Sequence, residues 1–448
     1  MTIWANLFKR FKAPALPNPG REYSQDYTLR LIDTLRLYFN QLDYLLERIV
    51  NAQPVAVNFY GGAIDAFGRA RFSQPFTLFD SQNRYAKNDL FDEATAAGGS
   101  VSYVANASTV NLEVTASSGS EVVRQTFRSF SYQPGKSLLV MNTFVMPAAS
   151  ANQRIRIGYF SPENGVFLER DGADVYITRR TYVTGTAVDT RVAQADWNGD
   201  KLNGVGDSGF TLDLTKAQIF WQDFEWLGVG SVRCGFVING QTIICHTFQN
   251  ANNLTSVYMT TAILPIRYEI TNTGASTGAV LKQICSTVIS EGGYEKRVNL
   301  NVARMTAKNT GITTSFEPLV SIRLASGRTG AVVLPDGYSV LCSGTNGEFE
   351  IALFKNATLT GASFVASDSA NVEYDISATA MTGGTMIRNT YTSSDNKIDG
   401  SVDSPENYNW DLQIGATIGG TSDVYTLAVR TLSGTHSAIG SLSFWDLT

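Results

Sequence analysis

The stretch QDFEWLGVGSVRCGFVINGQTIICHTFQ, residues Gln222–Gln249, carries the strongest local folding signal in the chain. Its dipeptide Asn239-Gly240 tolerates the positive φ angles of a type I′ turn and joins two β-rich segments, which predicts a tight hairpin. A two-residue turn fixes the strand register. The expected opposed pairs are Ile238–Gln241, Phe236–Ile243 and Cys234–Cys245. Alternation predicts one buried face, with Arg233 on the other. The buried face comprises Val232, Cys234, Phe236, Ile238, Ile243 and Cys245. We expect this hairpin at the centre of a large antiparallel sheet.

The composition is that of a globular, β-rich chain. At 448 residues it is long enough for two or three domains, and it is 43% hydrophobic and 17% charged. Its turn residues, β-branched residues and aromatics favour strands. The low charged fraction suggests surface hidden in an assembly. The net charge of −5 argues against a nucleic-acid partner. No apolar run reaches the roughly 18–20 residues of a membrane span.

The four cysteines, Cys234, Cys245, Cys285 and Cys342, lack metal-ligand spacing. The expected register makes Cys234 and Cys245 a hydrogen-bonded pair, in which the side chains splay apart. Two buried free thiols are therefore favoured over a disulfide, which stays the alternative. This fits assembly in a reducing compartment.

Residues 1–20, MTIWANLFKRFKAPALPNPG, combine one apolar helical face with basic residues and end in prolines. The face consists of Ile3, Trp4, Leu7, Phe8 and Phe11. A secretory signal would need a longer apolar region after the basic residues. We interpret the segment as a docking peptide that inserts its aromatics into a partner protein. A membrane-surface helix and a terminus packed on its own domain remain alternatives.

Residues 21–53 contain the clearest helix of the sequence, predicted over about Ser24–Val50 and stopped before Pro54. Apolar residues follow the 4-3-4-3-4 spacing of a coiled coil. They are Leu31, Leu35, Tyr38, Leu42, Leu45 and Ile49. Neighbouring apolar residues widen the stripe beyond a two-stranded seam, so a homotrimer is favoured. The alternatives are a helix that lies on a neighbouring subunit and an amphipathic helix that covers its own sheet.

The rest of the chain reads as a connector, 54–84, and two β-domains, 85–290 and 291–448. About a dozen strand-like runs between residues 100 and 274 suffice for two packed sheets. Further candidate strands follow in the second domain, Trp410–Ile414 among them. The predicted fold class is therefore all-β with one N-terminal helix and two antiparallel β-sandwich domains.

The sequence contains few residues that could bind a metal ion or act as a catalytic histidine. The only histidines are His246 and His436, so a Ser-His-Asp triad or a two-histidine metal site has almost no candidates, and a structural role is favoured for each. The segment from Asp196 to Asp207 imitates the oxygen spacing of a calcium loop, but Lys201 replaces the required glycine. An ordinary turn is favoured over calcium binding, and no cofactor is expected.

Other candidate sites also have simpler structural explanations. Asp223 and Glu225 could form a glycosidase pair, although alternating polar residues on a half-buried strand produce the same pattern. We expect Arg179-Arg180 and the pair Arg124 and Arg128 to meet acidic neighbours or a partner subunit. Aromatics could form a sugar-stacking platform, although core packing explains most of them. The aromatics considered are Tyr159, Tyr182, Trp197 and Trp221.

Several phrases resemble a family of tailed-bacteriophage virion structural proteins. They are RQTFRSFSYQPGKS (Arg124–Ser137), FEWLGVGSVRCGFVINGQTIICHTFQNAN (Phe224–Asn252) and LPIRYEITNTG (Leu264–Gly274). The segment Leu16–Asp43 resembles an N-terminal segment of phage particle proteins, especially those of aquatic phages. The likeness covers most of residues 16–274 and is less clear over 291–448.

The resemblance implies a non-enzymatic virion component of tail, fibre or neck, assembled in the host cytoplasm, with jelly-roll-like sandwiches. Its expected partners are copies of itself and other virion proteins, with a host surface glycan as a further candidate. A capsid decoration protein is the first alternative, and a glycan-binding or glycan-degrading receptor-binding module is the second.

Overall fold

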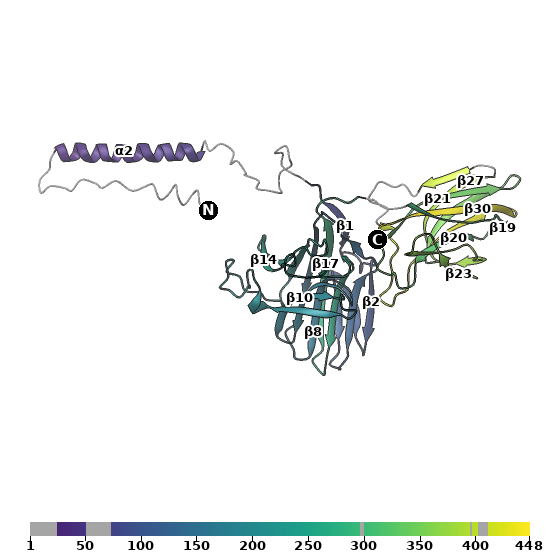
Figure 1. The fold of residues 1–448 in the computed structure, drawn as a ribbon, viewed down its shortest axis with the longest axis horizontal. Coiled ribbons are helices and arrows are strands. Elements are labelled where there is room, and N and C mark those ends of the chain that lie inside the picture. Colours follow the sequence, from purple (N-terminus) through teal and green to yellow (C-terminus); the bar gives the residue numbers. More distant parts are fainter. Residues whose placement is uncertain (1–24, 51–72, 296–299, 395–396, 402–410) are drawn as a thin grey trace. The chain divides into compact units, whose positions relative to one another are not determined.

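The computed structural model describes residues 25–50, 73–295, 300–394, 397–401 and 411–448. The chain divides into two compact units, residues 1–72 and 73–448, which are described separately. The predicted docking residues Ile3, Trp4, Leu7, Phe8 and Phe11 lie outside the described residues. The architecture is all-β with one long N-terminal helix, as predicted (Figure 1).

The helix α2 (Gln25–Val50) has the extent that the sequence predicts. Asp26 lies in its first turn, where a carboxylate stabilises the helix N-terminus, and pairs with Arg30 at 2.9 Å. Side chains are described up to Asp43, so Leu45 and Ile49 of the predicted seam lie outside that range.

Two antiparallel sheets form the first jelly-roll-like sandwich (Figure 1). The 8-stranded sheet has the order β14 (Gln241–Phe248), β13 (Val232–Ile238), β12 (Gln218–Phe224), β7 (Leu138–Val145), β17 (Ala279–Ser290), β4 (Thr109–Val114), β3 (Ser100–Val104), with β1 (Phe76–Ser81) paired to β17. The 7-stranded sheet has the order β11 (Val188–Ala193), β10 (Asp174–Thr181), β9 (Gly165–Asp171), β8 (Gln153–Phe160), β16 (Ile266–Asn272), β5 (Glu121–Thr126), β2 (Phe91–Ala96). A two-stranded sheet adds β6 (Phe130–Ser131) and β15 (Ile263–Leu264).

Two further sheets form the second jelly-roll-like sandwich. The 5-stranded sheet contains β18 (Leu300–Arg304), β30 (His436–Asp446), β21 (Val333–Ser343), β28 (Lys397–Ser401) and, paired to β30, β19 (Asn309–Ile312). The 6-stranded sheet has the order β24 (Val365–Ala366), β25 (Val372–Asp375), β20 (Glu317–Leu324), β29 (Val424–Thr431), β22 (Glu348–Lys355), β27 (Thr385–Ser393). The strands β23 (Thr358–Thr360) and β26 (Ala380–Thr382) form a small separate sheet.

The predicted hairpin is β13–β14, and its turn has positive φ at both Asn239 and Gly240. The pairs Ile238–Gln241 and Phe236–Ile243 are confirmed. The predicted pair Cys234–Cys245 is wrong, because a bulge shifts the register and places His246 opposite Cys234. Both thiols are buried and free, as favoured.

The prediction that this hairpin lies at the centre of its sheet is also wrong. β14 is an edge strand. The loop at residues 198–200 covers part of that edge, because Gly199 N and Asp200 N donate to Cys245 O and Ile244 O at 2.8 and 3.0 Å. Covering an edge in this way prevents it from pairing with another chain.

The two sandwiches share an interface within the unit 73–448. Val332, Leu334 and Leu447 of the second sandwich belong to the hydrophobic core of the first. Hydrogen bonds that connect them include Ala416 N to Phe127 O (2.8 Å), Gln413 Nε2 to Ser129 O (2.8 Å) and Ile418 N to Asp92 Oδ2 (2.6 Å). The strand predicted over Trp410–Ile414 is therefore wrong for residues 411–414, where the backbone is irregular and contacts the first sandwich instead.

Candidate functional site

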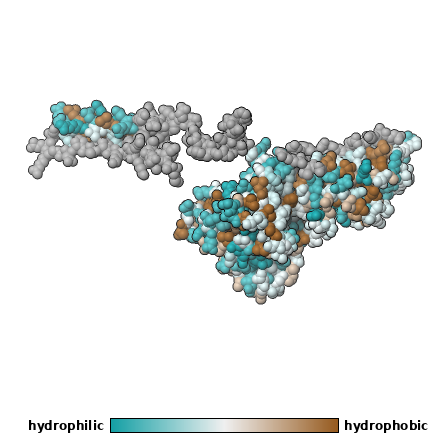
Figure 2. Space-filling view, in the orientation of Figure 1, coloured by the Kyte–Doolittle hydropathy of each residue, from teal (hydrophilic) through white to brown (hydrophobic). Residues whose placement is uncertain are grey.

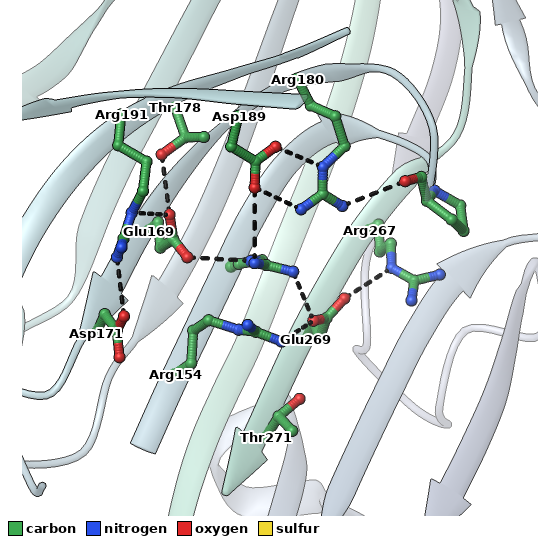
Figure 3. A network of polar contacts seen from close by, with 12 residues as sticks. Arg154, Glu169, Asp171, Thr178, Arg180, Asp189, Arg191, Arg267, Glu269 and Thr271 are labelled. Carbon is green, nitrogen blue, oxygen red and sulfur yellow. Dashed lines mark hydrogen bonds and ion pairs between the residues drawn. The ribbon is translucent and has the colours of Figure 1, made fainter. Parts of the chain in front are cut away.

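A network of arginines and carboxylates covers the 7-stranded sheet on the face away from the core (Figure 3). Strand alternation explains why it exists. Ile155, Ile157 and Leu168 point into the core, so the residues between them point outward. The outward positions of β8, β9, β10, β11 and β16 hold Arg154, Arg156, Glu169, Asp171, Thr178, Arg180, Asp189, Arg191, Arg267 and Glu269. The network thus joins five neighbouring strands.

Arg156 connects the centre of the network to three carboxylates. It contacts Glu169 at 3.2 Å, Glu269 at 3.4 Å and Asp189 at 3.9 Å. Asp189 in turn accepts a bidentate pair of hydrogen bonds from Arg180, from Nε at 2.7 Å and from Nη2 at 2.8 Å. A bidentate pair of this kind fixes both the position and the orientation of the guanidinium relative to the carboxylate.

Glu169 and Glu269 are the most deeply buried carboxylates of the network. Glu169 is 1% exposed and also contacts Arg191 at 3.0 Å and the hydroxyl of Thr178 at 3.0 Å. Glu269 is 5% exposed and contacts Arg154, Arg156 and Arg267 at 3.8, 3.4 and 3.1 Å. Three guanidinium groups therefore share the single negative charge of Glu269.

Two aromatic rings lie beneath these guanidinium groups. Arg156 and Arg180 lie 5.5 and 5.2 Å from the ring centre of Phe167, and Arg267 lies 5.8 Å from that of Phe160. Both rings are fully buried, which makes the cation–π attraction stronger than it would be in water. The arginine stems thereby cover apolar surface while their heads bind carboxylates.

The electrostatics of the network keep Glu269 and Asp189 ionised. Burial alone would raise the pKa of Glu269, but Arg267, Arg156 and Arg154 outweigh it, and the pKa lies below its usual value. Burial opposes ionisation of Asp189 as well, yet the hydrogen bonds and charge of Arg180 hold its pKa low. A glycosidase needs one carboxylic acid that stays protonated near neutral pH, with a raised pKa. Neither residue meets that requirement.

The lowered pKa values predict that the protein loses stability in acid. A carboxylate whose pKa is lower in the folded state adds stability above its unfolded pKa, about 4.3 for Glu and 3.9 for Asp. That contribution disappears as the pH falls through the folded pKa. Urea unfolding at several pH values between about 7 and 3 should show the free energy of unfolding falling in the acid part of this range. A free energy that stays constant over this range would contradict the prediction.

The predicted carboxylate pair Asp223 and Glu225 lines a pocket of 450 Å³. Asp223 is buried and already accepts hydrogen bonds from Ser137 and Arg233. Glu225 is exposed beyond the end of β12 and accepts from Ser231 Oγ at 3.2 Å. Asp223 therefore serves as the partner of a cross-strand arginine.

The predicted calcium-like loop is organised by its own backbone. Asp200 accepts hydrogen bonds from Leu202 N at 2.8 Å and Ser208 N at 2.7 Å, one on each carboxylate oxygen. In the described residues, no group of three or more His, Cys, Asp or Glu side chains is placed to hold a metal ion. His246 is buried, accepts a hydrogen bond from Asn198 N at 3.4 Å, and has a pKa lowered by burial. The turn interpretation of the loop agrees with these contacts.

The remaining candidates are structural. Arg124, Arg128 and Arg180 pair with Glu93, Asp411 and Asp189, as expected, whereas Arg179 donates to the amide oxygen of Asn250. Tyr159, Trp197 and Trp221 are at most 5% exposed and cannot stack on a sugar. Tyr182 alone of the four aromatics is partly exposed.

The helix seam presents apolar surface to solvent. Leu31, Tyr38 and Leu42 are partly exposed, and Leu35 is 36% exposed. Apolar residues also lie beside the seam, as Figure 2 illustrates for one face of α2. They are Leu29, Ile32, Leu37 and Phe39, with exposed fractions of 55%, 40%, 64% and 56%. Within the described part of the chain, no helix is both long and apolar enough to cross a membrane.

No protein-family model matches the sequence, and no curated protein matches it either. Solved structures similar to about half of the chain include a β-glucanase from Bacillus licheniformis, with a TM-score of 0.32 and 13% identity over 47% of this chain and 96% of the other. A protein of unknown function from Shewanella oneidensis MR-1 has a TM-score of 0.33 and 9% identity over 50% and 91%. A carbohydrate esterase from the Shiga toxin-encoding bacteriophage phi24B has a TM-score of 0.28 and 12% identity over 49% and 100%. These similarities concern the β-sandwich architecture and identify neither a reaction nor a ligand.

Proposed function

We propose that the protein is a non-enzymatic structural component of a tailed-bacteriophage particle, in a tail, fibre or neck. In this proposal α2 associates with copies of itself, residues 1–20 attach to other virion proteins, and the sandwiches are rigid outer modules. The observation that carries it is the apolar surface of α2 at coiled-coil spacing. The resemblance of several sequence phrases to virion structural proteins supports the location.

The physical case for self-association starts from exposed apolar area. Leu31, Leu35, Tyr38 and Leu42 fall on one stripe, and Ile32 and Phe39 widen it. Burying a leucine side chain stabilises an interface by roughly 1.5–3 kcal/mol. A stripe wider than an a/d seam is better covered by two neighbouring helices than by one, which favours a trimer.

The variant Leu35→Asp should dissociate the oligomer, because it places a charge in the buried seam. Light scattering coupled to size-exclusion chromatography of the full chain should give three times the 48.7-kDa chain mass for the natural protein and a single-chain mass for the variant. Asn40→Asp adds the same charge at an exposed position outside the seam and should stay trimeric. A monomeric natural protein, or a trimeric Leu35→Asp variant, would refute self-association through α2.

A separate experiment tests where on the phage particle the protein lies. Immunogold electron microscopy with an antibody against the second sandwich should label the tail or neck of intact particles. Even labelling of the head would identify a capsid decoration protein instead. Unlabelled particles would remove the virion assignment altogether.

A further inference from the structure

A cavity of 500 Å³ lies between the two sandwiches, within the unit 73–448. The first sandwich contributes Arg267 and residues 161–163 to its lining, and the second contributes Arg328, Asn371 and Thr417. Ligand sites commonly occupy clefts of roughly 300–1,000 Å³ where two domains meet.

Arg267 connects this cavity to the charged network. It is only 9% exposed, and it donates through Nε to Glu269 at 3.1 Å and through Nη1 to Gln125 at 2.8 Å. Its Nη2 group has no acceptor among the residues that the structure describes. Arg267 lines the cavity, and this donor is the one that we assign to a bound molecule.

The charge of Arg267 is incompletely balanced. Glu269 also contacts Arg154 and Arg156, so its one negative charge serves three guanidinium groups. The whole network contains one arginine more than its carboxylates. The arginines are Arg154, Arg156, Arg180, Arg191 and Arg267, and the carboxylates are Glu169, Asp171, Asp189 and Glu269. Arg267 is one of three arginines in the network that are at most 9% exposed, and an anion at its guanidinium would compensate its charge.

The rest of the lining fits a saccharide. Hydroxyl-bearing residues surround the cavity, among them Ser129, Thr261, Thr329 and Thr417. Phe127, Pro162 and Pro265 add apolar surface against which a sugar ring can pack. Arg328 is exposed and adds a second positive charge, while Glu163 contributes one negative charge.

We propose that this cavity binds an acidic monosaccharide unit, a uronate or sialate, within a surface polysaccharide. Its carboxylate lies against Arg267 and Arg328, and its hydroxyl groups face the serine and threonine side chains. The inference concerns the cavity alone and holds wherever on a particle the protein is placed.

The test is isothermal titration calorimetry of the full chain with trigalacturonate, with α2,8-linked trisialate and with neutral maltotriose. One of the two acidic trisaccharides should bind, maltotriose should not, and salt at about 0.5 M should weaken binding by screening. Arg328→Gln should weaken binding about tenfold, close to 1.4 kcal/mol. Arg84→Gln removes an exposed arginine outside the cavity and should leave binding unchanged.

A second variant tests the cavity without altering its charge. A Cβ at Gly330 would meet only Ser129 Oγ, at 3.9 Å, so Gly330→Tyr can be accommodated and should block the cavity. Binding should then disappear while the unfolding transition stays in place. The proposal falls if neither acidic trisaccharide binds, if maltotriose binds equally well, or if binding survives both Arg328→Gln and Gly330→Tyr.

Discussion

Replacing Glu269 with glutamine is expected to lower the free energy of unfolding by about 3 kcal/mol, because removing one partner of a buried charge group leaves the others uncompensated. Arg154, Arg156 and Arg267 all contact this carboxylate, and Arg156 and Arg267 are at least nine-tenths buried. Glutamine keeps the shape and one acceptor but loses the charge. Urea unfolding at neutral pH measures the difference.

Asp171→Asn is the matched control for that experiment. Asp171 belongs to the same network, but its side chain is 39% exposed and its partner Arg191 is 35% exposed. Exposed ion pairs typically contribute less than about 1 kcal/mol. If Glu269→Gln costs no more than Asp171→Asn, the network is not the stabilising element described above.

The variant Tyr159→Phe is expected to lower the free energy of unfolding by about 1–3 kcal/mol, since a buried polar group left without a partner costs about 1–3 kcal/mol. The Tyr159 hydroxyl lies 2.5 Å from Phe130 O and 2.6 Å from Ala262 O, and accepts from Leu264 N at 3.2 Å. These contacts hold the small β6–β15 sheet against the core. Thermal or urea unfolding measures the loss.

Tyr182→Phe serves as the control for Tyr159→Phe, because Tyr182 is partly exposed. It should change the free energy of unfolding by less than about 0.5 kcal/mol, as surface substitutions usually do. Equal effects of the two substitutions would show that the buried hydroxyl of Tyr159 contributes little.

Local signals in the sequence predicted local structure well. Asn239-Gly240 identified the hairpin, and apolar spacing identified α2, because both depend on neighbours a few residues away. The bulge in β14 was missed although Gly235 signals it. A Cβ there would lie 1.8 Å from Ile243 O, and a glycine inside a strand often marks such a close approach.

The charged network could not be predicted in the same way. Arg156 and Glu269 are 113 residues apart in the chain, and only the order of the strands makes them neighbours. The sequence did contain one signal, because Arg154 and Arg156 alternate with isoleucines on β8. It predicts a charged sheet face, but not which strands complete it. The contacts of residues 411–418 with the first sandwich could not be predicted either, because they also join segments that lie far apart in the chain.

The second sandwich contributes side chains to the hydrophobic core of the first, so the two sandwiches are not independent modules. Val332, Leu334 and Leu447 fill part of the first sandwich's interior although they belong to the second. The second sandwich therefore cannot be exchanged for an unrelated domain by recombination at the end of β17 without opening a hole in its neighbour. Sequence changes would therefore be tolerated mainly in surface loops, with both sandwiches inherited together as one block.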